Sequence, residues 1–135
     1  MKKLLLLAAL MLCFGFAAKA QVYKFNATDF SIKYYNEQRG QWDDWSKWEK
    51  SHMLIVMNYD AEKFTIYSKE KQEYDIYEYE ETGDSDGEGG KVWSYLCVNT
   101  EGSRCRIRLR QQNDGPWQMY IDFNDVMWVY CMELK

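Results

Sequence analysis

Polar and apolar residues alternate strictly over Arg104–Gln111, where every second position is an arginine and Cys105, Ile107 and Leu109 fill the positions between. Successive side chains of a β-strand point to opposite faces of its sheet. The segment is therefore predicted to be an antiparallel strand with one apolar face and one charged, solvated face.

Strand-like patterns separated by short, turn-rich segments continue along most of the chain. The eight predicted strands are Thr28–Tyr35, Met53–Tyr59, Lys63–Lys69, Gln72–Thr82, Lys91–Asn99, Arg104–Gln111, Trp117–Phe123 and Val126–Leu134. Strands joined in sequence by tight turns predict an all-β fold. We expect a single antiparallel meander that closes into a small barrel, with a two-sheet sandwich as the alternative.

The pairing of the last two strands follows from a two-residue turn at Asn124-Asp125. This turn sets Ile121 opposite Trp128 and Met119 opposite Tyr130, so every inward pair is apolar. A slip of one residue would set Trp128 against a polar neighbour, which makes the predicted register specific.

The fourth predicted strand changes its inward phase between Ile76 and Tyr77. One extra residue in a strand reverses the phase of everything that follows, so a β-bulge is predicted at this point. Bulges are common in curved and closed sheets, which favours the barrel.

The N-terminus has the pattern of a secretory signal peptide: Lys2 and Lys3, an apolar run over Leu4–Phe16, and the small-residue site Ala18-Lys19-Ala20. Residues 1–20 are therefore predicted to be removed, leaving residues 21–135 as a single antiparallel β domain. No second apolar run follows, so we expect no transmembrane segment after removal and a periplasmic or secreted location.

The predicted signal peptide contains three lysines and no acidic residue, so residues 21–135 carry 14 basic and 21 acidic residues, a net charge of −7. An acidic chain is a poor partner for nucleic acid. Its 115 residues suit one domain with one core, and we expect a monomer.

Three cysteines lie beyond the predicted cleavage site: Cys97, Cys105 and Cys131. A three-residue hairpin loop at Thr100-Glu101-Gly102 would set Cys97 directly across from Cys105, and an oxidising compartment would join them in a disulfide. Cys131 lies opposite Gln118 and is expected to be unpaired. The alternative is three reduced, buried thiols.

Tryptophans recur every three residues at Trp42, Trp45 and Trp48, which predicts a short helical turn near residues 42–48 with an aromatic stripe. Such a stripe suits a ligand-binding platform, since an indole offers a large flat apolar face. The alternative, which we favour, is a plug that covers one open end of the fold.

The arginine stripe is the second candidate site, because guanidinium groups bind carboxylates with paired hydrogen bonds. The residues of this possible face for an anionic partner are Arg104, Arg106, Arg108 and Arg110. The alternative, again favoured, is cross-strand pairing with acidic residues of Glu73–Glu81 or with Asp122.

Catalytic and metal-binding patterns are poor. The loop Thr82–Gly90 contains an Asp-x-Asp-Gly element, but Thr82 and Trp93 occupy the positions where an EF-hand needs carboxylates. The only histidine is His52, which has no evident partner for nucleophilic chemistry. We therefore predict no cofactor, no metal site and no catalytic residues.

Several segments together resemble uncharacterised small exported proteins of Gram-negative bacteria. They are the Trp42 and Trp45 cluster, the strand Phe64–Ser68, the Cys97 and Cys105 hairpin, and Tyr120–Phe123. By architecture alone the chain is also similar to calycin-type barrels such as lipocalins, although the Gly-x-Trp signature of lipocalins does not open the first predicted strand. The resemblance implies a fold and leaves the function open.

The sequence thus predicts an exported, non-catalytic binding protein for a small apolar or sugar-like ligand. The alternative is a protein-interaction or enzyme-inhibitor module that presents an edge strand, a loop or the arginine face. A hydrolase is the third hypothesis.

Overall fold

The computed structural model describes residues 21–80 and 84–135. The signal peptide predicted for residues 1–20 lies outside the described residues, as do the last two positions of the strand predicted over Gln72–Thr82. Within the described residues the fold is all-β, and no helix is present that could cross a membrane.

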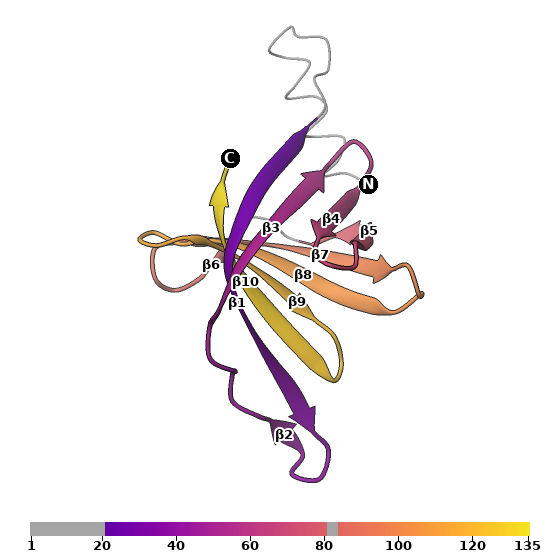
Figure 1. Ribbon diagram of the computed structural model, residues 1–135, viewed down its shortest axis with the longest axis vertical. Helices are drawn as coiled ribbons and strands as arrows, with labels where there is room; N and C mark the ends of the chain where they lie inside the picture. Colours follow the sequence, from indigo (N-terminus) through magenta and orange to yellow (C-terminus); the bar gives the residue numbers. More distant parts are fainter. Residues whose placement is uncertain (1–20, 81–83) are drawn as a thin grey trace, which may run out of the picture.

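Residues 21–80 and 84–135 form ten strands, eight long ones and two of two residues each (Figure 1). They are β1 (Val22–Asn36), β2 (Gln41–Trp42), β3 (Glu49–Asn58), β4 (Lys63–Tyr67), β5 (Gln72–Tyr79), β6 (Asp84–Ser85), β7 (Lys91–Asn99), β8 (Arg104–Gln111), β9 (Trp117–Asp122) and β10 (Val126–Leu134). Each of the eight predicted strands corresponds to one of the long ones, and the bounds of β7, β8 and β10 match the prediction.

The long strands form one closed antiparallel sheet, in the order β10-β9-β8-β7-β5-β4-β3-β1. Strand β1 closes the circle by pairing with β10, from Phe25 opposite Leu134 to Tyr34 opposite Val126. This closure confirms the predicted barrel and excludes the two-sheet sandwich. Strand β2 pairs with Tyr35 and Asn36, the last two residues of β1, and β6 pairs with β7.

The barrel interior is filled by the apolar positions of the alternating strands. Ile107 and Ile121 face each other across β8 and β9 and are fully buried. The core also contains Phe25, Ala27, Ile55, Met57, Phe64, Ile66, Tyr74, Ile76, Tyr95, Cys97, Cys105, Leu109, Met119, Tyr130 and Met132. The side of the β8–β10 ribbon predicted to be dry is therefore the inside of the barrel.

Two finer predictions of register are confirmed. Trp128 pairs with Ile121, as the two-residue turn required, and the register of β5 shifts between Ile76 and Glu78, which makes Tyr77 the extra residue of a bulge. A second shift in β1, between Ala27 and Asp29, was not predicted.

The predicted helical turn near residues 42–48 is wrong. Trp42 is the second residue of β2, opposite Tyr35, and the chain then follows the outside of β1 in irregular extended form. Backbone N–H groups of Asp43 and Ser46 donate to carbonyls of β1, at 2.9 and 2.8 Å. Hydrogen bonds to β1 thus replace those that a helix would have made.

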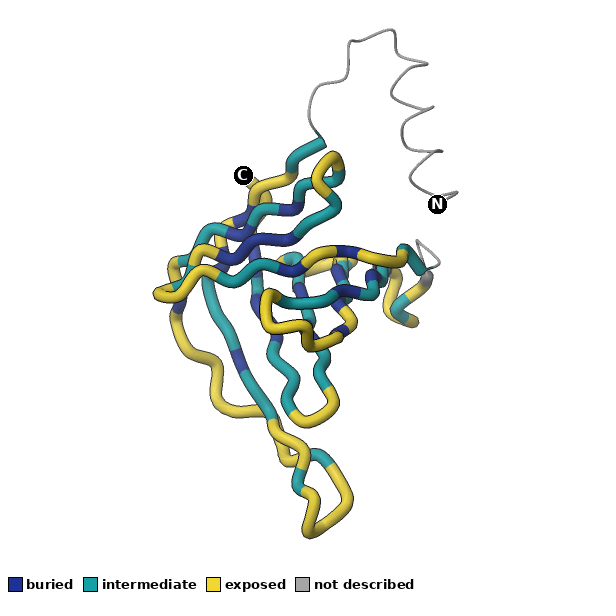
Figure 2. Tube along the Cα trace, turned by 90° about the vertical axis from the view of Figure 1, so that its right-hand side faces the viewer, coloured by how far each residue is buried: buried dark blue, intermediate teal, exposed yellow. Residues whose placement is uncertain are grey.

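The end of β1, β2 and residues 43–48 together form a projection that we call the β1–β2 arm. The arm extends from the barrel at the lower end in Figure 1, where most of its residues are exposed (Figure 2).

The predicted disulfide between Cys97 and Cys105 is also wrong, although the two residues lie directly opposite each other. Both thiols are free and buried, and Cys131 is free. The Asn99 N–H donates to the carbonyl of Ser103, which makes these two residues a hydrogen-bonded pair. Hydrogen-bonded and non-hydrogen-bonded pairs alternate along an antiparallel ladder, so Cys97 and Cys105, two positions further on, are also a hydrogen-bonded pair. Side chains lie farther apart in such pairs than in the intervening ones, which disfavours the short Cβ separation of a disulfide.

Candidate functional site

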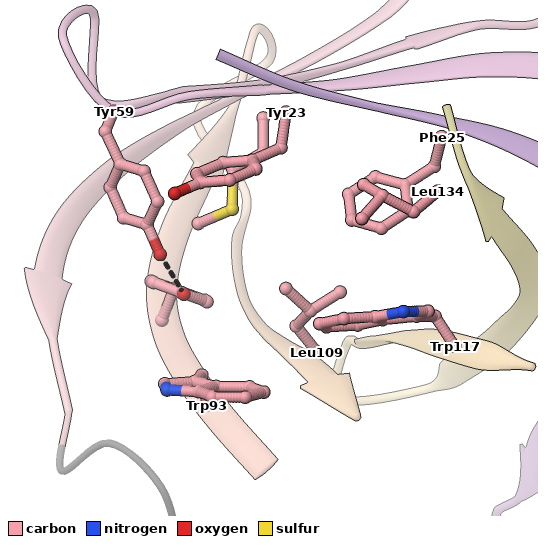
Figure 3. Close-up of a pocket in the computed structure, with 9 residues that line it drawn as sticks. Tyr23, Phe25, Tyr59, Trp93, Leu109, Trp117 and Leu134 are labelled. Carbon is pink, nitrogen blue, oxygen red and sulfur yellow. Dashed lines mark hydrogen bonds between the residues drawn. The ribbon is translucent and has the colours of Figure 1, made fainter. Parts of the chain in front are cut away.

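The clearest candidate site is a cavity of about 290 Å³ that opens at one end of the barrel. This end is where β1 begins and β10 finishes, opposite to the β1–β2 arm (Figure 1). The nine residues that line the cavity are Tyr23, Phe25, Met57, Tyr59, Trp93, Tyr95, Leu109, Trp117 and Leu134 (Figure 3). We call this cavity the aromatic mouth.

The inward phase of the strands explains why these side chains meet. Trp93 and Tyr95 are two residues apart on β7 and continue the face that carries Cys97. Trp117 begins β9 on the face that carries Met119. Large rings at the terminal inward positions of several strands therefore surround the opening instead of filling the centre.

Ring contacts hold the wall of the aromatic mouth together. Trp93 and Trp117 stack with centroids 6.1 Å apart and planes 18° apart, and Phe25 lies 5.6 Å from Trp117. On the other side, Tyr23 meets Tyr59 edge to face at 5.9 Å. Such pairs add stabilisation beyond the area that they bury, so the wall is preorganised without a ligand.

Three tyrosines line the aromatic mouth; Tyr23 is 45% exposed, and the hydroxyls of the other two form a pair. The hydroxyl oxygens of Tyr59 and Tyr95 lie 2.7 Å apart, a hydrogen bond that Figure 3 marks. Burial raises the pKa of both phenols above the ordinary value of 10.0, and does so more strongly for Tyr95. Both groups are therefore protonated and neutral in neutral water.

Exposure differs sharply between the entrance and the base of the aromatic mouth. Tyr23 and Leu134 are 45% and 52% exposed, whereas Phe25 and Tyr95 are almost completely buried. A ligand would thus pass two exposed side chains at the entrance and reach the buried base of the cavity. This gradient is typical of small-molecule sites.

A second, polar cavity of about 220 Å³ lies at the other end of the barrel, between the β4–β5 and β7–β8 loops. Phe123 and Trp128 supply aromatic surface there, with ring centroids 5.6 Å apart. Glu73 and Asn99 are among its polar residues. Its chemistry differs from that of the aromatic mouth, because carboxylates and amides make up much of its lining.

The tryptophans predicted to bind a ligand do not line the aromatic mouth. Trp42 packs against Tyr35 in the β1–β2 arm, with centroids 5.5 Å apart. Trp45 contacts Tyr120 on the outer wall of the barrel at 6.2 Å, and Trp48 is 52% exposed. They line no end of the barrel as a plug would, and a ligand at these residues stays a prediction.

The arginine face is largely paired with acidic side chains of the same chain. Arg106 binds Glu80 through Nε and Nη2, at 2.8 and 3.2 Å. Arg108 binds Asp122 in the same two-pronged way, at 2.6 and 3.0 Å. These contacts agree with the alternative that we favoured from the sequence, cross-strand pairing.

The remaining two arginines lie at the ends of the stripe. Arg110 binds Asp86 at 2.9 Å and Glu88 at 2.8 Å. The guanidinium of Arg104 lies 5.5 Å from the centroid of Tyr77, the bulge residue. The attraction of the face for an external anion is therefore reduced by partners within the chain.

The loop that carries the Asp-x-Asp-Gly element is committed to hydrogen bonds of its own, and its residues before Asp84 lie outside the described residues. The Asp86 carboxylate accepts the backbone N–H groups of Glu88 and Gly90, each at 2.8 Å, as well as Arg110. Within the described residues no group of three or more potential ligand side chains gathers in a way that would hold a metal ion.

Comparison with known proteins gives no relative: neither a protein-family model, nor a curated protein, nor a solved structure matches the chain. The functional argument therefore rests on the geometry of the molecule.

Sequence reasoning missed the aromatic mouth because its residues are scattered over six of the long strands and one loop. The sequence pattern places Tyr59, Trp93 and Trp117 in predicted strands without a binding role, and Tyr23 lies outside the predicted strands. The signal that could have located the site is the presence of aromatic residues at the terminal inward positions of several strands. Which end of the barrel they surround depends on closure between β1 and β10, which no local pattern specifies.

Proposed function

We propose that this protein is an exported, non-catalytic binding protein that takes a small apolar ligand into the aromatic mouth. The observation that carries the proposal is the lining itself, because none of its nine described residues is charged. An apolar molecule that leaves water for this cavity gains hydrophobic stabilisation, and its binding leaves no charged side chain buried without a partner.

The size of the aromatic mouth supports a ligand with one or two rings or a short chain. Ligand cavities for drug-sized molecules begin at about 300 Å³, while an apolar cavity of about 150 Å³ accepts benzene. At about 290 Å³ the mouth lies between these values. An eight-stranded barrel with a ligand at one end is also the arrangement of the calycin-type barrels that the sequence resembles.

Export is the second part of the proposal. It is supported by the signal-peptide pattern of residues 1–20 and places the protein in the periplasm or outside the cell. An extracytoplasmic protein that binds without catalysis would sequester, carry or sense its ligand.

The test uses a neutral fluorescent probe, N-phenyl-1-naphthylamine, titrated into the purified protein. We expect saturable binding that enhances the emission of the probe. Tyr23→Ala should weaken the affinity about 3- to 10-fold, since this change removes an aromatic contact at the entrance. The matched control is Tyr34→Ala, which alters another exposed tyrosine of the same strand at the opposite end. Failure of the probe to bind, or equal losses in both variants, would contradict the proposal.

A protein-interaction or inhibitor module is the second candidate, and the exposed aromatic residues of the β1–β2 arm favour it. Tyr34 and Trp48 are both more than half exposed there. Exposed aromatic residues are enriched at protein interfaces. If this candidate were correct, small ligands would leave the thermal stability unchanged, and a Tyr34→Ala/Trp48→Ala double variant would lose the biological activity while keeping its fold.

A sugar-like ligand is the third candidate, and it would occupy the polar cavity at the other end of the barrel instead. Amides, carboxylates and two aromatic rings suit a hydroxyl-rich molecule. A thermal-shift screen against monosaccharides tests this candidate, because a ligand that binds only the folded state raises the melting temperature.

A further inference from the structure

The hydroxyl pair of the aromatic mouth has one proton more than its internal hydrogen bond uses. Each phenol carries one O–H donor, and the single contact of 2.7 Å between Tyr59 and Tyr95 consumes only one of them. The other hydroxyl must donate to water or to a ligand, since an unpaired buried donor is costly.

Burial indicates which tyrosine donates within the pair. Tyr95 is 1% exposed, and its hydroxyl makes no other hydrogen bond with the described residues. If Tyr95 donates to Tyr59, the deeply buried proton is satisfied and the proton left over belongs to the half-buried Tyr59. The reverse arrangement would leave the buried proton without a partner. Burial is the largest cause of the raised pKa of Tyr95, followed by charge repulsion from Tyr59 and by the hydrogen bond between them. The same hydrogen bond lowers the pKa of Tyr59, which agrees with Tyr95 as the donor.

The surroundings leave no good alternative acceptor for the remaining proton. Tyr79 stacks on Tyr59 with centroids 6.2 Å apart, but its buried hydroxyl makes no hydrogen bond and so does not accept this proton. Tyr23 also carries a hydroxyl, but it is 45% exposed at the entrance and makes no hydrogen bond with Tyr59. The other lining residues are apolar or are indoles, which only donate. The aromatic mouth is thus an uncharged surface in which the Tyr59 hydroxyl is a half-buried O–H donor without an acceptor among the described residues.

We propose that the aromatic mouth selects neutral molecules in which a hydrogen-bond acceptor, such as a carbonyl or ether oxygen, stands next to an apolar ring, and that the Tyr59 hydroxyl donates to that acceptor. This inference rests on the proposed function and adds to it the chemical class of the ligand. Carboxylates, including fatty-acid anions, are disfavoured because none of the lining residues offers a positive charge to compensate their loss of hydration.

The experiment compares three probes of one size and ring system by isothermal titration calorimetry at pH 7. 2-Acetonaphthone carries a neutral acceptor, 2-ethylnaphthalene carries none, and 2-naphthoate carries an anion. We expect the ketone to bind about 3- to 10-fold more tightly than the hydrocarbon, the range of one hydrogen bond, and more tightly than the anion.

Variants assign the donor. Tyr59→Phe is expected to reduce the ratio of ketone to hydrocarbon affinity to about one, because it removes the proposed donor. The control is Tyr77→Phe, which alters an exposed tyrosine at the bulge of β5 and should preserve the preference. Melting temperatures of both variants verify that each is folded.

The outcomes separate the two proposals. Equal binding of ketone and hydrocarbon, tightest binding of the anion, or a preference that survives Tyr59→Phe would overturn the selectivity and leave the apolar binding function standing. If none of the three probes binds, the proposed function and the inference fall together.

Discussion

Glu62 illustrates how a single residue stores strain in the turn between β3 and β4. Among the described residues it is the one non-glycine position with a positive φ, at 53°. Its Oε2 atom is also buried without a hydrogen-bond partner. A left-handed backbone costs an L-residue about 1–2 kcal/mol, and an unpaired buried oxygen adds to that cost.

The substitution Glu62→Gly should therefore stabilise the protein. We expect the free energy of unfolding to rise by about 0.5–1 kcal/mol, because glycine adopts this conformation without strain but loses more chain entropy on folding. Urea denaturation measures the change. The control Ala61→Gly, at a neighbouring position without positive φ, should lower the stability; a loss of stability in Glu62→Gly as well would refute the argument.

The carboxyl group of Asp86 makes stability depend on pH. A backbone hydrogen bond from Glu88, and then hydrogen bonds from the Arg110 side chain and the Gly90 backbone, hold its pKa below the ordinary value of 3.8. Since the folded-state pKa is lower than the unfolded one, the contribution is fully present above about pH 3.8 and is lost as the pH falls through the folded-state pKa.

Asp86→Asn should consequently be less stable than the natural protein at pH 7, by an amount that shrinks as the pH falls below about 4. Chemical denaturation at a series of pH values gives this difference directly. Asp125→Asn, in the exposed turn before β10, serves as control. A stability difference for Asp86→Asn that stays constant down to pH 2 would show that its charge does not matter.

At the scale of elements, the periodicity of the sequence predicted the long strands correctly but not the conformation of residues 43–48. The tryptophan spacing has a helical period, but Ser46 provides a competing interaction: its Oγ accepts the N–H of Ile32 at 3.0 Å and lies 3.2 Å from Ser31 Oγ. The segment is therefore held by β1, a partner more than ten residues away that a local period does not reveal.

Ser46→Ala is expected to lower the free energy of unfolding by about 1 kcal/mol, because it removes the acceptor for Ile32 and a partner for the buried Ser31. Hydrogen exchange should show faster exchange of the Ile32 amide in this variant. Ser103→Ala, at an exposed turn position, should change stability by less than about 0.5 kcal/mol. An Ile32 amide that exchanges at the same rate in both variants would contradict this role for Ser46.

For the whole molecule, the sequence favoured the barrel but did not locate the site. Alternation along β8 and the paired turn residues before β10 specify which face is buried, whereas the sandwich is excluded only by the pairing of β1 with β10. The aromatic mouth depends on how β1 meets β10, which brings Phe25 to the same opening as Trp117. The free state of Cys97 and Cys105 depends on the hydrogen-bonding phase of their pair, which a sequence pattern alone does not give.

The central claim is that a ligand enters the aromatic mouth and not the β1–β2 arm, and the six tryptophans of the chain can report this directly. The measurement is a titration of ¹⁵N-labelled protein with 2-acetonaphthone, followed through the indole N–H resonances. We predict that the resonances of Trp93 and Trp117 shift and saturate together, while those of Trp42, Trp45 and Trp48 stay in place. Shifts confined to the three arm tryptophans, or no shift at all, would contradict the account.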